Sequence, residues 1–301
     1  IITKLPHINI TLEKMTSELM KRPISELLDE SKMPKKRFFR TRAHCNPLSY
    51  NDGFAYPVCP SEFDWEKHYP NIPEDKREVT VLDIGMGFGG LTVSLATSLP
   101  DNLVLGMEIR AKVCEYVRLR VDALRNEHPG QYQNASCLRT NCMRYLPNFF
   151  RKHQMEKIFI CFPDPHFKAK NHRRRIVSHI LLSEYAYLIK PGGRLYTVTD
   201  VEELHKWHVE KCEAHPAFRR VPDEEAHKDP GVRSMLEDTE ESKKVARLQG
   251  NKHFAVYERL PDWNNESTNS SNGKSNSSDA GSINNSSGEQ VFESHIMKLW
   301  K

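Results

Sequence analysis

The sequence predicts an α/β fold of the Rossmann-like type, in which helices cover both faces of a mostly parallel β-sheet. Three observations support this prediction. Apolar segments of strand length alternate with amphipathic helical segments, the first strand runs straight into a glycine-rich loop, and acidic residues stand at the ends of strands. Alternating strands and helices form parallel β-α units. Ligands of such sheets bind beyond the carboxyl ends of the strands, so the residues that follow strands are the candidates for a functional site.

Five segments have the length and apolar composition of strands, at 79–84, 102–108, 157–162, 194–200 and 253–260. We expect a helix directly after the glycine loop, at 91–99. Two further segments, 110–126 and 175–189, repeat apolar residues at intervals of three or four positions. This spacing places the apolar residues on one face of a helix.

Composition divides the chain of 301 residues into four regions. Residues 1–40 form a basic arm that we expect to be flexible, and residues 41–262 have the composition of one folded domain. Residues 263–289 are mostly Ser, Asn, Gly and Asp, and cannot bury enough apolar surface to offset the entropy lost on ordering. We therefore expect a disordered linker there, followed by a short segment at 290–301 that regains apolar residues.

Net charge and cysteine content exclude few classes of protein. The net charge of +4 is too small by itself to indicate a nucleic-acid partner. No run approaches the roughly 18 consecutive apolar residues of a membrane helix, so we expect no membrane span. The seven cysteines form no CxxC pair and no metal-binding spacing, which predicts reduced intracellular thiols and no metal site.

The glycine loop at 85–90 indicates a bound cofactor. Glycines permit positive φ angles and let backbone N–H groups approach a ligand closely. The loop alone would also suit a dinucleotide, or simply a tight turn between strand and helix. Glu108 closes the next strand, where its carboxylate can accept hydrogen bonds from ribose hydroxyls. Asp83 suits a sulfonium and an amino group better than a pyrophosphate, so S-adenosyl-L-methionine is the favoured cofactor.

The segment after strand 157–162 indicates the acceptor side of the site. Pro163 and Pro165 stiffen the turn and place Asp164 at the ligand-binding edge of the sheet, although aspartate is also common in plain turns. A basic run with Phe167 at its start follows, and a second basic run lies at 32–44. Such runs are often only solvated surface, but beside the predicted site they indicate RNA phosphate contacts. The side chains expected to contact RNA are Lys35, Lys36, Arg37, Arg40, Arg42, Lys168, Lys170, His172, Arg173, Arg174 and Arg175.

Several motifs together resemble those of the eukaryotic tRNA (guanine-N7)-methyltransferases. They are KKRFFRTRAHCNP at 35–47, LDIGMGFGG at 82–90, LGMEIR at 105–110, LRTNCMRYLPNFF at 138–150, FPDPHFK at 162–168 and TEESKK at 239–244. The resemblance covers about residues 35–260, and FPDPHFK and TEESKK are its most specific parts. It implies a class I methyltransferase with a seven-stranded sheet and an antiparallel last strand. It also implies a guanine at position 46 of the tRNA variable loop as target, a heterodimer with a WD-repeat β-propeller subunit, and a largely nuclear location, with the cytoplasm as the alternative.

The resemblance also implies roles for individual residues. Asp164 matches the catalytic acid. Residues that match the cofactor site are Gly85, Glu108, Ile109, Arg110, Asn141, Cys142 and Cys161. A loop that closes over cofactor and guanine is matched by Thr239, Glu240 and Glu241, of which Thr239 also has the chemistry of a helix N-cap. Asn171 departs from the family pattern, where we expect lysine, so one phosphate contact is in doubt.

The chemistry of guanine N7 favours a positioning role for Asp164. N7 carries a lone pair and no proton, so its attack on a sulfonium methyl group needs alignment and charge stabilisation but no general base. A Rossmann-type oxidoreductase and a non-catalytic RNA-binding scaffold are the two alternatives. No residues after strand 157–162 indicate a hydride-acceptor site, and the complete acidic set argues against a scaffold.

Overall fold

The computed structural model describes residues 33–42, 45–49 and 53–262. These residues belong to one compact unit that ends at Asp262. Most of the basic arm, and all of segments 263–289 and 290–301, lie outside the described residues. Within the described part, no helix combines the length and the apolar composition needed to cross a membrane.

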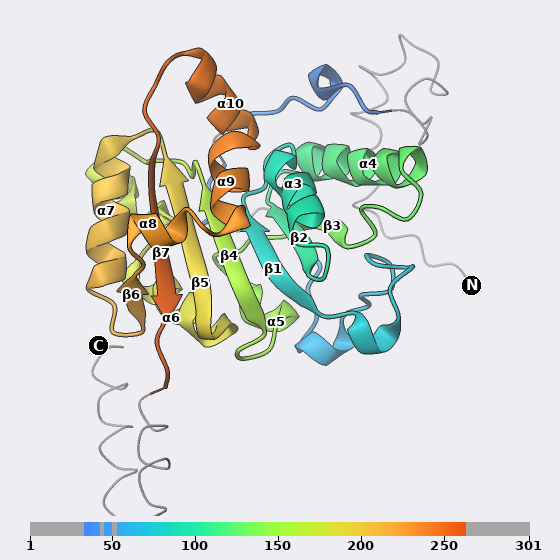
Figure 1. Ribbon diagram of the computed structural model, residues 1–301, viewed down its shortest axis with the longest axis horizontal. Coiled ribbons are helices and arrows are strands. Elements are labelled where there is room, and N and C mark those ends of the chain that lie inside the picture. Colours follow the sequence, from blue (N-terminus) through green and yellow to red (C-terminus); the bar gives the residue numbers. More distant parts are fainter. Residues whose placement is uncertain (1–32, 43–44, 50–52, 263–301) are drawn as a thin grey trace, which may run out of the picture. The chain divides into compact units, whose positions relative to one another are not determined.

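A seven-stranded sheet forms the centre of this unit, with strand order β3-β2-β1-β4-β5-β7-β6 (Figure 1). Strands β1 to β5 pair in parallel, whereas β7 runs antiparallel to both β5 and β6. The predicted sheet and its antiparallel last strand are therefore confirmed. The strands are β1 (Val79–Ile84), β2 (Leu103–Glu108), β3 (Ala135–Arg139), β4 (Met155–Cys161), β5 (Ile189–Thr199), β6 (Phe218–Arg220) and β7 (His253–Arg259).

Helices cover both faces of the sheet, and each face has its own hydrophobic core. Figure 1 is viewed from the face that carries α3, α8 and α9. The helices that pack on this side or continue from it are α3 (Gly90–Ser98), α4 (Ala111–Glu127), α8 (Asp223–Ala226), α9 (Pro230–Glu237) and α10 (Glu240–Arg247). The opposite face carries α5 (Leu146–Phe149), α6 (His179–Leu188) and α7 (Glu202–Glu213). Short 3-10 turns are η1 (Lys36–Phe38), η2 (Pro60–Glu62), η3 (Glu74–Lys76) and η4 (Ala169–Arg174).

Burial on both faces explains why the central strands could be predicted from the sequence. Every residue of β2 is buried, as are all but one of β1. Parallel strands covered on both sides require such near-continuous apolar runs. The outer strands β3 and β6 were not among the five segments expected from apolar composition, although the resemblance implied seven strands. They read ASCLR and FRR, and both are too short to stand out as apolar runs.

One predicted helix starts later than its apolar spacing suggested. Segment 175–189 becomes helical only at His179, because Ser178 is the N-cap and its side chain accepts from the backbone N–H of Leu181. Residues 176–178 form a bend, and the 3-10 turn η4 at 169–174 precedes them. The delay matters for the site, since it leaves the basic run on a separate turn beside the ends of the strands.

Candidate active site

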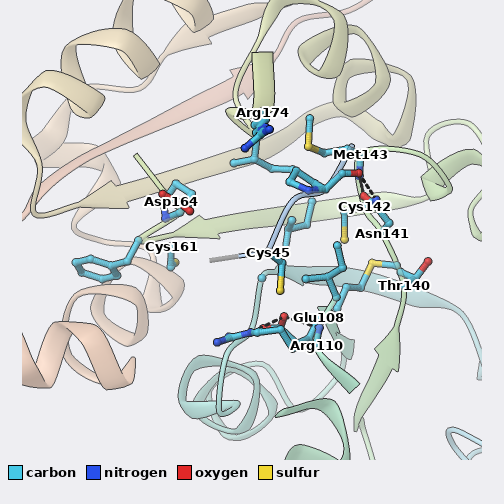
Figure 2. Close-up of a pocket in the computed structure, with 18 of the residues that line it drawn as sticks. Cys45, Glu108, Arg110, Thr140, Asn141, Cys142, Met143, Cys161, Asp164 and Arg174 are labelled. Atoms are coloured by element: carbon cyan, nitrogen blue, oxygen red, sulfur yellow. Dashed lines mark hydrogen bonds and ion pairs between the residues drawn. The ribbon is translucent and has the colours of Figure 1, made fainter. Parts of the chain in front are cut away.

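A cavity of about 230 Å³ opens at the carboxyl ends of the central strands (Figure 2). Its walls come from the glycine loop, from the residues that follow β2, β3 and β4, and from the segment at 45–47. The structure thus brings together eight of the residues predicted for cofactor binding and catalysis. They are Gly85, Glu108, Ile109, Arg110, Asn141, Cys142, Cys161 and Asp164.

A second hollow of about 450 Å³ adjoins the first. Asp164, His166, Arg174 and Cys45 line both hollows. The second hollow is completed by Asn46, Phe167, Lys168 and Asn171. The ring of Phe167 is 65% exposed, so a flat aromatic surface is available at this place. Asp164 therefore lies where two adjacent spaces meet.

The glycine loop has the backbone that its sequence predicted. Gly85, Gly87 and Gly89 have φ angles of +76°, +55° and +75°. A β-carbon at Gly85 would have nothing within 4 Å, so the left-handed backbone, and not a lack of space, requires glycine there. The loop bends the chain from β1 into α3, and leaves Gly85 at the wall of the cavity.

Glu108 and Arg110 form a closed pair at the end of β2. The Arg110 guanidinium donates to both carboxylate oxygens, and its backbone N–H donates to Oε1 at 3.0 Å. Figure 2 shows this pair on one side of the cavity and Asp164 with Arg174 on the other, with Cys45 between them in this view. The carboxylate is only 4% exposed, so its orientation toward the cavity is fixed by these bonds.

Asn141 ties a distant segment to the cavity. Its amide nitrogen donates to the carbonyl of Pro47 at 2.6 Å, and its oxygen accepts from the backbone N–H of Met143 at 3.0 Å. These two bonds hold residues 45–49 beside the end of β3. Cys45 and Pro47 thereby become wall residues of the cavity, which no local sequence signal had indicated.

Asp83 lies behind the cavity wall. It is 1% exposed and accepts a hydrogen bond of 2.7 Å from the hydroxyl of Thr92 on α3. Burial raises the pKa of Asp83 to about 7. The direct contact between Asp83 and a cofactor that the sequence suggested is not what the structure shows, because this carboxyl group bonds to α3 and is not among the lining residues.

The loop that carries Asp164 has an unusual backbone. Phe162 and His166, on either side of it, have φ angles of +49° and +46°. Left-handed angles at such residues cost energy and cluster at functional sites. The backbone N–H of His166 donates to Oδ1 of Asp164 at 3.2 Å, and the ring Nδ1 lies 3.7 Å from the same oxygen. The loop therefore fixes the carboxylate between the two hollows.

The basic turn η4 is divided between surface and interior. Lys168, Lys170 and Arg173 are exposed, as the RNA-binding prediction requires. Arg175 contradicts the prediction, since it is 2% exposed, donates to the carbonyl of Pro165 at 2.9 Å and pairs with Glu203 at 3.0 Å. Its guanidinium stacks on the ring of Trp207 at 4.6 Å.

Arg175 therefore anchors the Asp164 loop and is not available to a phosphate. His172 is half-buried, and its ring packs edge-on against Trp207 at 5.3 Å. Both residues hold η4 in place from the inside. Arg174 points the other way and lines both hollows.

The arm residues also divide into two groups. Lys35, Arg37, Arg40 and Arg42 are exposed. Lys36 is instead engaged within the chain, where its Nζ lies 2.8 Å from Oε1 of Glu240. In this structure Lys36 is an internal ion-pair partner, which differs from the free phosphate contact predicted from the sequence.

The predicted closing loop lies next to the glycine loop and outside the cavity wall. Thr239 is the N-cap of α10, and its hydroxyl accepts from the backbone N–H of Ser242 at 2.8 Å, as expected. Glu240 accepts from the backbone N–H of Gly90 at 3.0 Å. Glu241 pairs with Lys244 at 3.0 Å. None of these three acidic or capping residues is among the residues that line the cavity.

Comparisons with known proteins agree on one family. A family model described as "Putative methyltransferase" matches residues 77–255. Proteins named tRNA (guanine-N(7)-)-methyltransferase are 51% identical in Anopheles gambiae, over 77% of this chain and 97% of theirs, and 52% identical in Schizosaccharomyces pombe, over 77% and 87%. The protein of that name from Botryotinia fuckeliana is 51% identical over 78% of this chain and 92% of its own length.

Solved structures give weaker matches. The 16S rRNA methyltransferase KamB covers 69% of this chain with a TM-score of 0.43 and 17% identity, a similarity too low to bear on function.

Proposed function

This chain belongs to the tRNA (guanine-N(7)-)-methyltransferase family, and on that premise we propose which of its residues perform the reaction. The reaction itself is the transfer of a methyl group from S-adenosyl-L-methionine to N7 of a guanine in tRNA. One observation carries the assignment of the site. Asp164 lies at the boundary between a cavity that fits the cofactor and a hollow open to a base.

The first cavity fits S-adenosyl-L-methionine. Its wall combines the carboxylate of Glu108, suited to ribose hydroxyls, with apolar side chains suited to an adenine ring, among them Ile84, Met107 and Ile109. The cavity wall carries the paired charges of Glu108 and Arg110 and, among the described residues, no cluster of cationic groups of the kind that a pyrophosphate needs. We propose that Gly85, Glu108, Ile109, Arg110, Asn141, Cys142 and Cys161 hold it, with Thr239, Glu240 and Glu241 closing over them. When bound, this cofactor supplies an electrophilic methyl group.

The second hollow fits a nucleobase that has left the tRNA stack. Phe167 offers an exposed ring for stacking, and Asp164 offers a carboxylate that can accept from guanine N1–H and the 2-amino group. A guanine held by that edge presents N7 on its opposite edge. The exposed Lys168, Lys170 and Arg173 stand beside this hollow as contacts for backbone phosphates.

The residues of this chain act by position and charge. Guanine N7 has a free lone pair, so no side chain has to remove a proton before the methyl group is transferred. The purine ring becomes cationic as its N7 is methylated, and the fixed carboxylate of Asp164 stabilises that charge. The hydrogen bond from the His166 backbone holds the carboxylate in place.

We further propose the guanine at position 46 of the tRNA variable loop as target, a WD-repeat β-propeller as partner subunit, and the nucleus as the main location. Support for these comes from the resemblance of segments 35–47, 162–168 and 239–244 to the eukaryotic enzymes. Co-expression with a propeller subunit of the same organism, followed by gel filtration, tests the heterodimer. Separate elution of the two chains would refute it.

A transfer assay tests the function itself. The full chain, alone and with the partner subunit, is incubated with S-adenosyl-L-methionine labelled in the methyl group and with bulk tRNA, and the tRNA is digested to nucleosides. We expect the label in 7-methylguanosine. Label in another nucleoside would overturn the assignment of N7, and binding of a nicotinamide cofactor in place of S-adenosylhomocysteine would favour an oxidoreductase.

A further inference from the structure

A carboxylate of the chain itself, that of Glu240, binds at the N-terminus of helix α3. The carboxylate of Glu240 accepts the backbone N–H of Gly90 on Oε2 at 3.0 Å. Its other oxygen, Oε1, accepts from Lys36 at 2.8 Å and from Arg120 at 3.2 Å. Three parts of the chain that are distant in sequence, η1, α3 and α4, thus converge on one side chain.

These contacts have the composition of a phosphate site. A helix N-terminus carries partial positive charge and free N–H groups, and in Rossmann-like folds the helix after the glycine loop receives the phosphates of a dinucleotide. Here two cationic side chains reinforce that N-terminus. Arg120 is tied to the glycine loop as well, through a hydrogen bond of 2.8 Å to the carbonyl of Phe88. In this structure the carboxylate of Glu240 occupies the place that a phosphate takes in a dinucleotide-binding protein.

Little space remains for a second anion. A β-carbon at Gly90 would lie 2.5 Å from Oε2 of Glu240 and 2.6 Å from the carbonyl oxygen of Asp238. Glycine is therefore required at position 90 because α10 begins against it. A phosphate group, much larger than a methyl group, cannot share this position with the carboxylate.

Glu240 stays ionised in this setting. Burial opposes ionisation, but the hydrogen bond and the charge of Lys36, together with Arg120, lower the pKa of Glu240 below its ordinary value. Two further carboxyl groups, those of Asp83 and Glu108, stand close enough for their charges to interact, since both Glu240 and Glu108 contribute to the raised pKa of Asp83. Glu240 is thus the carboxylate of this group that occupies the start of α3 itself.

We infer that Glu240 determines the class of cofactor that this glycine loop accepts. By filling the phosphate position at the start of α3, it excludes dinucleotides and nucleoside diphosphates and leaves the cavity to an adenosine cofactor that carries no phosphate. The identity of that cofactor as S-adenosyl-L-methionine rests on the proposed function. The exclusion of phosphates is a separate property of Glu240, Lys36, Arg120 and Gly90.

Calorimetric titration of the full chain with S-adenosylhomocysteine and with ADP tests the inference. We expect the parent protein to bind S-adenosylhomocysteine and to show no ADP binding at millimolar concentration. Glu240→Ala leaves Lys36, Arg120 and the N–H of Gly90 without their anion, so its affinity for ADP should rise by at least about tenfold, the scale of one charged hydrogen bond. Glu237→Ala is the matched control, because Glu237 is exposed and pairs with Arg233 on the surface of α9.

Two further variants keep the outcome decisive. Glu240→Ser also removes most of the side-chain volume, keeps a polar group, and should show the same direction of change if the alanine variant fails to fold. Adding Lys36→Met to Glu240→Ala should remove most of the gained ADP affinity. Unchanged ADP affinity in folded Glu240 variants would overturn the inference while leaving the proposed function intact. Failure of the parent to bind S-adenosylhomocysteine would instead overturn the proposed function.

Discussion

The guanidinium of Arg110 donates to both carboxylate oxygens of Glu108, at 3.0 Å to Oε1 and at 2.8 Å to Oε2. The two residues are separated by a single position, at the point where β2 gives way to α4. A bidentate pair of this kind fixes the orientation of a carboxylate as well as its charge. Glu108 therefore presents a preorganised acceptor at the cavity wall, and Arg110 is the residue that positions it.

Removal of the Glu108 charge should weaken cofactor binding selectively. We expect Glu108→Gln to lower the affinity for S-adenosylhomocysteine by about 1.5–3 kcal/mol, the scale for a hydrogen bond to a charged group. Calorimetry measures this directly. Glu115→Gln is the control, since the Glu115 side chain is 43% exposed and pairs with Arg118 one turn along α4. Equal affinities of the Glu108 variant and the parent would remove Glu108 from the cofactor site.

Arg173 and Arg175, two positions apart, should have opposite mutational signatures. Arg173 is exposed. In a plot of the logarithm of tRNA affinity against the logarithm of salt concentration, Arg173→Ala should therefore make the slope shallower by about one. Its free energy of unfolding should stay unchanged. Arg175 is buried against Trp207, so Arg175→Ala should lower the free energy of unfolding by about 2 kcal/mol. Salt titrations and urea unfolding measure the two effects. Identical behaviour of the two variants would contradict the division of the basic run into surface and anchor.

The free energy of unfolding should decrease as the pH is lowered below neutrality, and His208 is the main cause. Neither ring nitrogen of this buried residue meets a hydrogen-bond partner among the described residues, and burial lowers its pKa to about 3. The unfolded chain binds a proton at this histidine near pH 6.5, whereas the folded chain does not until about pH 3. Between these values the free energy of unfolding should decrease as pH falls, by up to about 1.4 kcal/mol per pH unit.

Urea unfolding at a series of pH values checks this assignment. His208→Leu should flatten the dependence between neutral pH and pH 4, while His227→Gln, at an exposed position, should leave it unchanged. A slope unaltered by His208→Leu would mean that other groups, such as the buried His215 with its pKa lowered by burial to about 4, cause the acid sensitivity.

The parts of this protein that could be predicted from its sequence are those that local chemistry determines. The strand, glycine loop and helix at 79–98 follow from apolar runs and from glycines whose backbone no other residue tolerates well. Thr239 could be recognised as an N-cap because a capping hydroxyl acts within three residues. Asp164 could be placed because two prolines and the end of a strand flank it.

Long-range contacts could not be predicted in the same way. The sequence of a basic run does not show whether a given lysine or arginine contacts solvent, RNA or a distant carboxylate. Lys36 finds Glu240 across 204 positions, and Arg175 finds Glu203 across 28. Cys45 reaches the cavity only because Asn141 binds the carbonyl of Pro47, 94 positions away. These pairings depend on the assembled sheet.

The role of Asp164 can be separated from folding and from cofactor binding. It is partly exposed at the edge of the cavity, so Asp164→Ala should leave the free energy of unfolding nearly unchanged. Affinity for S-adenosylhomocysteine should stay within a few-fold, since Glu108 and the glycine loop carry that contact. Asp164→Asn keeps the size and one acceptor but loses the charge that favours a cationic product. We expect it to be slow as well, and a normal rate would mean that Asp164 only positions the base.

The rate of 7-methylguanosine formation in a single turnover, at saturating S-adenosyl-L-methionine and enzyme in excess over tRNA, tests the central claim most directly. The site at the junction of the two hollows predicts that the parent forms 7-methylguanosine. It also predicts that Asp164→Ala raises the barrier by about 2 to 4 kcal/mol, the scale for loss of one preorganised electrostatic contact. A variant as fast as the parent, or a parent that forms no 7-methylguanosine with its partner subunit present, would contradict it.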